Sequence, residues 1–235
     1  MTDPLVILPG FLMDARGFLP QVVHLGADRQ VVLPALAGET VEQMSLNAIR
    51  DLPRRFALVG HGLGGDVALD ILRRLPEAVT RIALVSTDPL SEPPATAAKR
   101  EARIVAARAG RLAEAVAGEY PAAALAETDW RDEVLALVQD MAAGLGVETY
   151  IRQTRALQRR PDQQKTLRKV KTPALILAGA ADSLVPVRRQ EVLAGLMPFG
   201  RLQVIEGAGH LPQLEQPEAL SEALRTFLAG PMLLR

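Results

Sequence analysis

The sequence predicts an α/β fold: a mostly parallel sheet of about six strands, flanked by helices, with an insertion that is helical throughout. Three observations lead to this prediction. Short apolar runs recur along the chain without polar alternation, which is typical of strands buried on both faces. Segments with helical periodicity separate these runs, as in parallel sheets that helices cover on both sides. Between about residues 90 and 170 the strand pattern stops and only helical patterns remain.

Each predicted strand is a short apolar run bounded by proline, glycine or polar residues. In chain order the runs are PLVILP (4–9), QVVLPAL (30–36), FALVG (56–60), RIALVS (81–86), PALILAG (173–179) and LQVIEG (202–207). Helices are expected over 65–75 and 217–228, where apolar residues recur at the spacing of one helix face. Pro217 marks the start of the second of these helices.

The helical insertion has recognisable borders. The segment DPLSEPP precedes it and KVKTP follows it, and both contain proline. Within it, residues 96–120, 131–142 and 146–159 are expected to be helical. We therefore predict a core formed by residues 1–89 and 171–235 and a helical cap formed by residues 90–170.

The composition excludes several classes of partner and cofactor. The 235 residues include 27 basic and 27 acidic side chains and no cysteine, so we expect no nucleic-acid or membrane partner, no disulfide and no thiolate ligand. No metal-ligand spacing and no Walker phosphate pattern occurs, and we expect no cofactor. The first residues, MTDPLVILPGF, contain neither a basic leader nor an apolar stretch of signal length, so a cytoplasmic protein is expected. A monomer or small homo-oligomer is also expected.

The segment ALVGHGLGGDVAL (57–69) has two interpretations. Gly60-x-Gly62-x-x-Gly65 between a strand and a helix matches the dinucleotide-binding fingerprint of a Rossmann protein, with Asp88 available for a ribose. That fingerprint normally opens the first βαβ unit, whereas two predicted strands precede this one. The alternative is the nucleophile elbow G-x-Nu-x-G, with Gly62 at the position of the nucleophile.

Two downstream residues favour the elbow. Asp182 follows one predicted strand in LILAGAADSLVP, and His210 follows the next in VIEGAGHLPQLEQPE. Position 62, Asp182 and His210 thus come in the chain order nucleophile, acid, base, each at the carboxyl edge of the predicted sheet. A dinucleotide-binding fold has no need of this trio.

These motifs make the chain resemble the α/β-hydrolase family, in particular a compact bacterial carboxylesterase with a helical cap. GHGLGG resembles the family's GHSxGG with Gly62 in place of serine, GAADSLVP resembles the acid loop, and GAGHLPQLEQPE resembles the histidine loop. ILPGFLMD resembles the loop after the first core strand, with Pro9 in place of the usual histidine. The resemblance implies an oxyanion hole formed by the backbone N–H groups of Phe11 and Leu63.

In an ester hydrolase with serine at position 62, His210 acts as the base and Asp182 orients its imidazole. Asp88, after a different strand, is a competing acid, although a turn into the cap also explains it. His61 and His24 are expected to be structural. Ser86 and Ser183 are weak candidates for the missing hydroxyl, because neither lies at the elbow.

Three hypotheses account for Gly62. The chain is an esterase whose nucleophile is replaced and whose catalysis is impaired, which we favour; or it binds ligands without turnover, as a pseudo-hydrolase; or His210 and Asp182 act as a general-base pair. Trp130, Met141 and Tyr150 are expected to form an apolar lid over the site. The predicted substrate is therefore a small to medium apolar ester.

Overall fold

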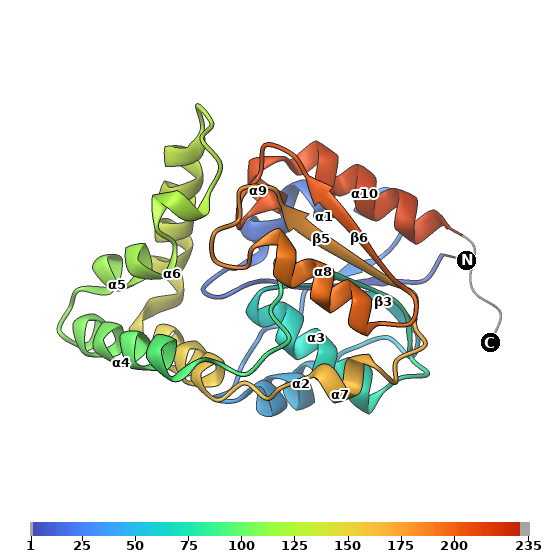
Figure 1. Cartoon of the computed structure of the whole chain (residues 1–235), viewed down its shortest axis with the longest axis horizontal. Coiled ribbons are helices and arrows are strands. Elements are labelled where there is room, and N and C mark those ends of the chain that lie inside the picture. The colour runs from blue at the N-terminus through green and yellow to red at the C-terminus, as the bar shows by residue number, and fades with distance from the viewer. Residues whose placement is uncertain (1, 231–235) are drawn as a thin grey trace.

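The predicted six-stranded parallel sheet is confirmed. The computed structural model of the chain describes residues 2–230, and Figure 1 shows its sheet with helices on both sides and a group of helices beside it. All neighbouring strands are parallel, in the order β2-β1-β3-β4-β5-β6. The strands are β1 (Leu5–Leu8), β2 (Val31–Val32), β3 (Phe56–His61), β4 (Val79–Val85), β5 (Ala174–Gly179) and β6 (Gly200–Ile205).

Helices cover both faces of the sheet. On one face lie η1 (Ala15–Phe18), α1 (Leu19–Gly26), α9 (Pro212–Glu215) and α10 (Pro217–Ala229). The other face carries α2 (Val41–Ile49), α3 (Leu63–Arg74) and α8 (Val187–Leu196). Between β4 and β5 the chain forms α4 (Pro94–Arg108), α5 (Leu112–Glu119), η2 (Ala122–Ala124), α6 (Arg131–Gln158) and α7 (Gln164–Leu167).

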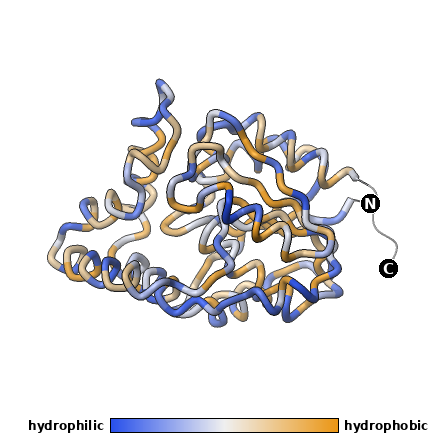
Figure 2. Tube along the Cα trace, viewed as in Figure 1, coloured by the Kyte–Doolittle hydropathy of each residue, from blue (hydrophilic) through white to orange (hydrophobic). Residues whose placement is uncertain are grey.

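The apolar runs of β1, β3, β4 and β5 are buried on both faces, which explains why they show no polar alternation. Leu5 and Ile7 of β1 belong to the hydrophobic cluster under α1 and α10, whereas Val6 and Leu8 belong to the cluster that includes α2 and α3. Figure 2 shows hydrophobic segments running through the sheet and hydrophilic stretches along the outer loops and helices. The second cluster continues from the sheet into the helices between β4 and β5.

Two elements differ from the expected ranges. The run 30–36 forms only the short edge strand β2, because Pro34 follows it and prolines do not extend a ladder. The predicted helix over 96–120 divides into α4 and α5 at Gly110, whose φ of 81° is not helical. These local breaks move element borders and leave the topology unchanged.

Helices α4, α5 and α6 pack against one another, while α7 contacts the core helices α3 and α8. By length and composition, α6 also qualifies as a membrane-spanning helix. Its backbone is interrupted at Gly146, however, with φ 79° and ψ 171°. Because each part is shorter than the about 20 residues that cross a bilayer, this helix is better explained by its packing within the cap.

The sheet order positions the candidate site. From β1 the chain moves to β2 on one side, and from β3 it moves to β4 on the other, so β1 and β3 flank a topological switch point. The loops after these two strands separate there and leave a crevice at their carboxyl ends. Phe11 lies in the first of these loops and Gly62 in the second.

Candidate active site

Gly62 lies at the tip of a tight turn between β3 and α3. Its φ of 49° and ψ of −116° belong to a region that residues with a side chain rarely adopt. Its N–H donates to the carbonyl oxygen of Val85 at 3.1 Å, and its own carbonyl accepts from Asp66 N at 3.1 Å. A Cβ atom at position 62 meets no atom within 4 Å. The turn thus presents an open space where a nucleophilic side chain would project.

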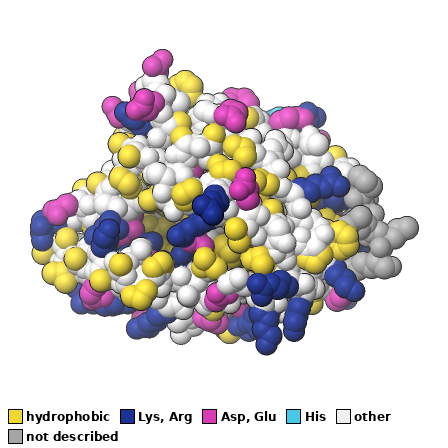
Figure 3. All heavy atoms as spheres, in the orientation of Figure 1, with side chains coloured by type: hydrophobic (Ala, Val, Ile, Leu, Met, Phe, Trp, Pro, Cys, Tyr) yellow, Lys and Arg dark blue, Asp and Glu magenta, His cyan; other side chains and the backbone are white. Residues whose placement is uncertain are grey.

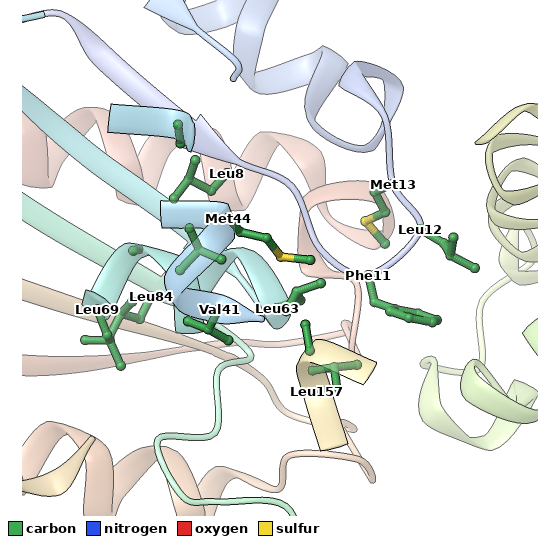
Figure 4. Packing of buried hydrophobic residues seen from close by; sticks show 14 of the residues in the cluster. Leu8, Phe11, Leu12, Met13, Val41, Met44, Leu63, Leu69, Leu84 and Leu157 are labelled. Atoms are coloured by element: carbon green, nitrogen blue, oxygen red, sulfur yellow. The ribbon is translucent and has the colours of Figure 1, made fainter. Parts of the chain in front are cut away.

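The turn is tight because strand and helix approach closely. A Cβ atom at Gly64 would lie 2.1 Å from the carbonyl oxygen of Leu8, so only glycine allows α3 to begin this near β1. Figure 4 shows Leu63 at the start of α3, with Leu8 and Phe11 from β1 and its following loop nearby. The spacing of glycines in the motif therefore has a direct steric cause.

His210 and Asp182 are paired. His210 lies in the loop between β6 and α9, and its Nδ1 is 3.0 Å from Oδ2 of Asp182, which follows β5. The other oxygen of Asp182 accepts hydrogen bonds from the N–H groups of Leu184 and Val185, both at 2.9 Å. The carboxylate is thereby fixed in one orientation toward the imidazole.

The surroundings of Asp182 favour its ionised form. Burial acts to raise the pKa of this carboxyl, but His210 and the hydrogen bonds it accepts outweigh burial and hold the pKa below its usual value. An ionised Asp182 accepts the proton of His210 Nδ1, so neutral His210 carries its lone pair on Nε2. That nitrogen is available to take a proton.

Phe11 and Leu63 both have backbone N–H groups without a hydrogen-bond acceptor in the part of the chain that the structure describes. Leu63 is the first residue of α3, so its N–H has no partner within the helix, and the N–H of Phe11 has no acceptor among residues 2–230. Both residues line the same cavity as Gly62 and His210. Free backbone N–H groups that converge on one point can stabilise an oxyanion.

Cap residues hold the Phe11 loop. The hydroxyl of Tyr120 donates to the carbonyl oxygen of Phe11 at 2.6 Å, and Gln153 Oε1 accepts from the N–H of Leu12 at 2.7 Å. Leu12 has a φ of 51°, which is strained for a residue with a side chain. Sequence reasoning missed Tyr120 and Gln153, because they lie far along the chain from the loop they hold.

Glu215 braces the histidine loop. Its carboxylate accepts hydrogen bonds from the N–H groups of Ala126, Gly209 and Leu211 at 2.7 to 2.9 Å. The N–H of His210 also donates to the carbonyl oxygen of Ala124 at 2.8 Å. The histidine loop is thus joined to the segment that follows α5. Glu215 lies within HLPQLEQPE, the segment that begins with His210. An acidic residue five positions after the histidine was the signal in the sequence that could have indicated this role.

His61 supports His210 from the other side. It is fully buried, and its Nε2–H donates to the carbonyl oxygen of His210 at 2.9 Å. Burial lowers the pKa of His61 to about 3, and the neighbouring His210 adds to this effect. His61 therefore stays neutral and holds the loop, which agrees with the structural role expected for it. His24 is exposed on α1.

Of the competing candidates, Asp88 and Ser86 line the cavity and Ser183 does not. Asp88 accepts from the N–H of Leu90 at 3.1 Å, as expected for a turn, and forms ion pairs with Arg160 and Arg189. Ser183 donates its hydroxyl to the carbonyl oxygen of Ala123 at 2.9 Å. Ser86 is buried at the end of β4 and lines the cavity, so it is the serine that an activity test must control for.

The cavity has a volume of about 330 Å³. The three residues expected to form an apolar lid over it are not part of its lining. Trp130 is 45% exposed and donates its indole N–H to the carbonyl oxygen of Glu215 at 3.1 Å. Met141 and Tyr150 are fully buried within the cap. None of the three lines the cavity, because α6 turns Met141 and Tyr150 toward its packing against other elements.

The wall of the cavity carries charged side chains as well as apolar ones. Its lining includes basic and acidic side chains from α4, α8 and the segments beside them, together with Phe11 and Leu157. Within the described part of the chain, no group of three His, Cys, Asp or Glu side chains could hold a metal ion. The arrangement offers a base, an acid, two N–H donors and a polar cavity, which suit acyl-transfer chemistry on a carbonyl.

The sequence matches the alpha/beta hydrolase family over residues 5–223, and the chain belongs to this family. The strand order also differs from the 3-2-1-4-5-6 order of a dinucleotide-binding Rossmann fold.

Among its relatives, the chain is similar to a pimeloyl-[acyl-carrier protein] methyl ester esterase from Aromatoleum aromaticum, with 28% identity over 96% of this chain and 98% of that protein. It is also 29% identical to the biotin biosynthesis bifunctional protein BioHC of Teredinibacter turnerae, over 95% of this chain. The chain spans 44% of the length of that bifunctional protein.

Solved structures have the same fold. A thermophilic esterase from Thermogutta terrifontis, solved with malate bound, superposes with a TM-score of 0.86 over 96% of this chain and 89% of that one, at 25% identity. The enol-lactonase from Burkholderia xenovorans LB400 gives a TM-score of 0.83 over 98% of this chain and 92% of that one. Its identity is 21%, so this second likeness concerns the fold alone.

Proposed function

We propose that this chain is a carboxylesterase-type hydrolase in which the base, its orienting acid and the oxyanion donors are in place and the covalent nucleophile is missing. The observation that carries the proposal is Gly62: it has the strained backbone of a nucleophile elbow, and open space surrounds the position of its absent Cβ. The esterases among its relatives support an ester as the substrate.

With serine at position 62, the expected reaction is a two-step acyl transfer. His210 Nε2 takes the hydroxyl proton as the oxygen attacks the ester carbonyl, and the N–H groups of Phe11 and Leu63 stabilise the oxyanion. His210 then returns the proton to the leaving alcohol, and water releases the acyl group by the same steps. Asp182 holds the imidazole in the required tautomer throughout.

With Gly62, the attacking oxygen is absent and no acyl-enzyme can form. The remaining groups can bind an ester and polarise its carbonyl. Removing one member of such a triad lowers kcat by about 10⁴ to 10⁶. We therefore expect the unmodified chain to bind esters and to hydrolyse them very slowly.

The test restores the hydroxyl and controls for the side chain that carries it. Gly62→Ser should raise the hydrolysis of 4-nitrophenyl acetate and butyrate by at least about 10³ over the unmodified chain. Gly62→Ala adds the same Cβ without the oxygen and should stay at the unmodified rate.

Two further variants assign the roles. His210→Ala in the Gly62→Ser background should abolish the gain, and Ser86→Ala in that background should leave it. If Gly62→Ser is folded and no faster than Gly62→Ala with either ester, the proposal is wrong.

A second function is favoured by one observation. The His210–Asp182 pair is present at 3.0 Å although no nucleophile accompanies it. Such a pair can act as a general base on water or on an acidic substrate proton. In that case the unmodified chain has an activity that His210→Ala abolishes and that Gly62→Ser does not increase.

A further inference from the structure

The cavity beside the candidate site carries more positive than negative side chains. Figure 3 shows basic and acidic side chains close together where the cap helices meet the body of the molecule. Five basic residues line the cavity: Lys99, Arg100, Arg103, Arg160 and Arg189. Three acidic residues line it: Asp88, Glu92 and Glu119. A concave wall with an excess of one sign of charge concentrates ligands of the opposite sign.

Part of this charge is neutralised within the wall itself. Arg100 pairs with both Glu92, at 2.5 Å, and Glu119. Arg160 lies 3.2 Å from Glu92 and 3.5 Å from Asp88, and its side chain is 11% exposed. The acidic residues around them therefore neutralise these two arginines, and Asp88 likewise pairs with Arg189.

Lys99 and Arg103 are the basic residues of the cavity that acidic neighbours neutralise least. Lys99 is exposed and has no ion-pair partner within residues 2–230. Arg103 pairs at 3.1 Å with Glu119, a carboxylate that it shares with Arg100, and its side chain is 29% exposed. The two residues are four apart on α4, so they lie on the same face of the helix, one turn apart.

A glycine in α5 makes room for the side chain of Arg103. A Cβ atom at residue 118 would lie 2.6 Å from Arg103 Nε, and Gly118 leaves the room that the guanidinium stem occupies. Arg100, on the same helix, also has its Cζ 6.0 Å from the centre of the Phe11 ring. Helix α4 therefore places its cations in the cavity that contains Phe11, Gly62 and His210.

We propose that this cavity takes an ester that also carries an anionic group, a carboxylate or a phosphate, bound by Lys99 and Arg103. This inference rests on the proposed function, since it names the substrate class of the same site. The ester carbonyl occupies the end of the cavity near Gly62, and the anionic group occupies the end near α4. The apolar ester expected from the sequence leaves these two cations without a ligand.

The test measures binding to the unmodified chain, which needs no turnover. Three stable methyl esters serve as probes in calorimetric titrations: monomethyl glutarate, methyl 4-(phosphonooxy)butanoate and the neutral methyl glutaramate. At least one anionic ester should bind ten-fold or more tightly than the neutral amide, and the preference should shrink at high salt. The tighter of the two anionic probes identifies the group.

Matched variants on α4 locate the binding site. Lys99→Gln and the double variant Lys99→Gln/Arg103→Gln should reduce and then remove the preference for the anionic probe. Arg108→Gln changes an exposed cation on the same helix outside the cavity and should leave the preference intact. Lys99→Gln removes no hydrogen bond or ion pair within residues 2–230, so its effect does not depend on altered folding.

Two results overturn the inference. One is equal or absent binding of the anionic and neutral probes; the other is a preference that the double variant keeps. The proposed function fails separately, if folded Gly62→Ser hydrolyses no ester. A chain that prefers anionic esters while Gly62→Ser is inactive would retain the binding inference and lose the esterase.

Discussion

The backbone turn at Gly62 is held by the surrounding backbone and needs no side chain at this position. The turn keeps its φ of 49° because Gly62 N–H bonds to Val85 and because α3 begins close to β1. A serine in this conformation carries strain of about 1–3 kcal/mol, which glycine avoids. On the proposed function, glycine at position 62 removes the nucleophile and at the same time relieves strain in the fold.

His61 leads to a prediction about pH. Its pKa falls to about 3 in the folded chain because of burial, whereas in the unfolded chain it is near 6.5. Between pH 6.5 and 3 the unfolded chain binds a proton that the folded chain does not, so this residue lowers stability as the pH falls, by up to about 1 kcal/mol per pH unit. His61→Gln keeps an N–H donor and should reduce this slope.

The measurement is urea unfolding at several pH values between 4 and 8. His24→Gln, on the exposed side of α1, is the control and should keep the slope of the unmodified chain. A His61→Gln curve parallel to that of the unmodified chain would show that His61 is not the group responsible.

At the scale of single residues, the sequence predicted what local motifs encode. His210 and Asp182 each follow a strand, and the chain order placed them at one edge of the sheet. The roles of Tyr120 and Gln153 had no such signal, because their partners in the Phe11 loop are 109 and 141 residues away. Contacts of this length depend on how the cap folds back.

At the scale of elements, the cap contributes to the candidate site through hydrogen bonds to core loops. Tyr120, which follows α5, bonds to Phe11, and Gln153 on α6 bonds to Leu12. The segment around Ala124 bonds to the histidine loop. The helical insertion therefore positions both the Phe11 loop and the loop of His210, besides forming part of the cavity wall.

Tyr120→Phe tests this positioning in the Gly62→Ser background. Without the 2.6 Å hydrogen bond from Tyr120 to the carbonyl oxygen of Phe11, the N–H group of Phe11 loses its fixed direction. Small displacements of groups that act in the transition state lower the rate strongly, and we expect kcat on 4-nitrophenyl butyrate to fall about ten-fold. KM should change less, because the ring remains.

Tyr150→Phe is the matched control. It removes another buried tyrosine hydroxyl of the cap, one that bonds to Glu119 at 3.3 Å and not to the Phe11 loop. Equal kcat values for the two variants would contradict a positioning role for Tyr120.

The strands show which elements a sequence predicts well. β1, β3, β4 and β5 are buried along their whole length, and the apolar runs within them indicated strands in the interior of the sheet. The edge strands β2 and β6 are partly exposed, and their borders were harder to place. The expected apolar lid was wrong in its residues, because an apolar helix face inside a cap packs against its neighbours before it can face a ligand.

At the scale of the whole molecule, charged residues connect the core to the cap. Asp66 on α3 lies 3.8 Å from Arg160, which follows α6, and Arg160 also pairs with Asp88 and Glu92 at the entrance to the cap. Arg100 and Glu119 continue the network into α4 and α5. Although the chain has no net charge, several ion pairs thus join its two parts.

Asp66 makes this network sensitive to pH. Burial raises its pKa to about 7, Arg160 and Arg100 oppose that rise, and Asp88 and Glu92 add to it. Between about pH 4 and 7 the folded chain therefore holds a proton that the unfolded chain has released. This term lowers the stability as the pH rises, by up to about 1 kcal/mol per pH unit.

Asp66→Asn removes this titration and should gain stability relative to the unmodified chain as the pH rises from 4 to 7. Urea unfolding across that range measures the gain, with the exposed Asp51→Asn as the control.

The effect of His61 has the opposite sign in the same window, so the two terms partly cancel in the unmodified chain. Asp66→Asn should then expose the loss of stability in acid that His61 causes, and His61→Gln should expose the loss toward neutral pH that Asp66 causes. Parallel curves for Asp66→Asn and the unmodified chain would mean that Asp66 stays ionised beside Arg160 throughout.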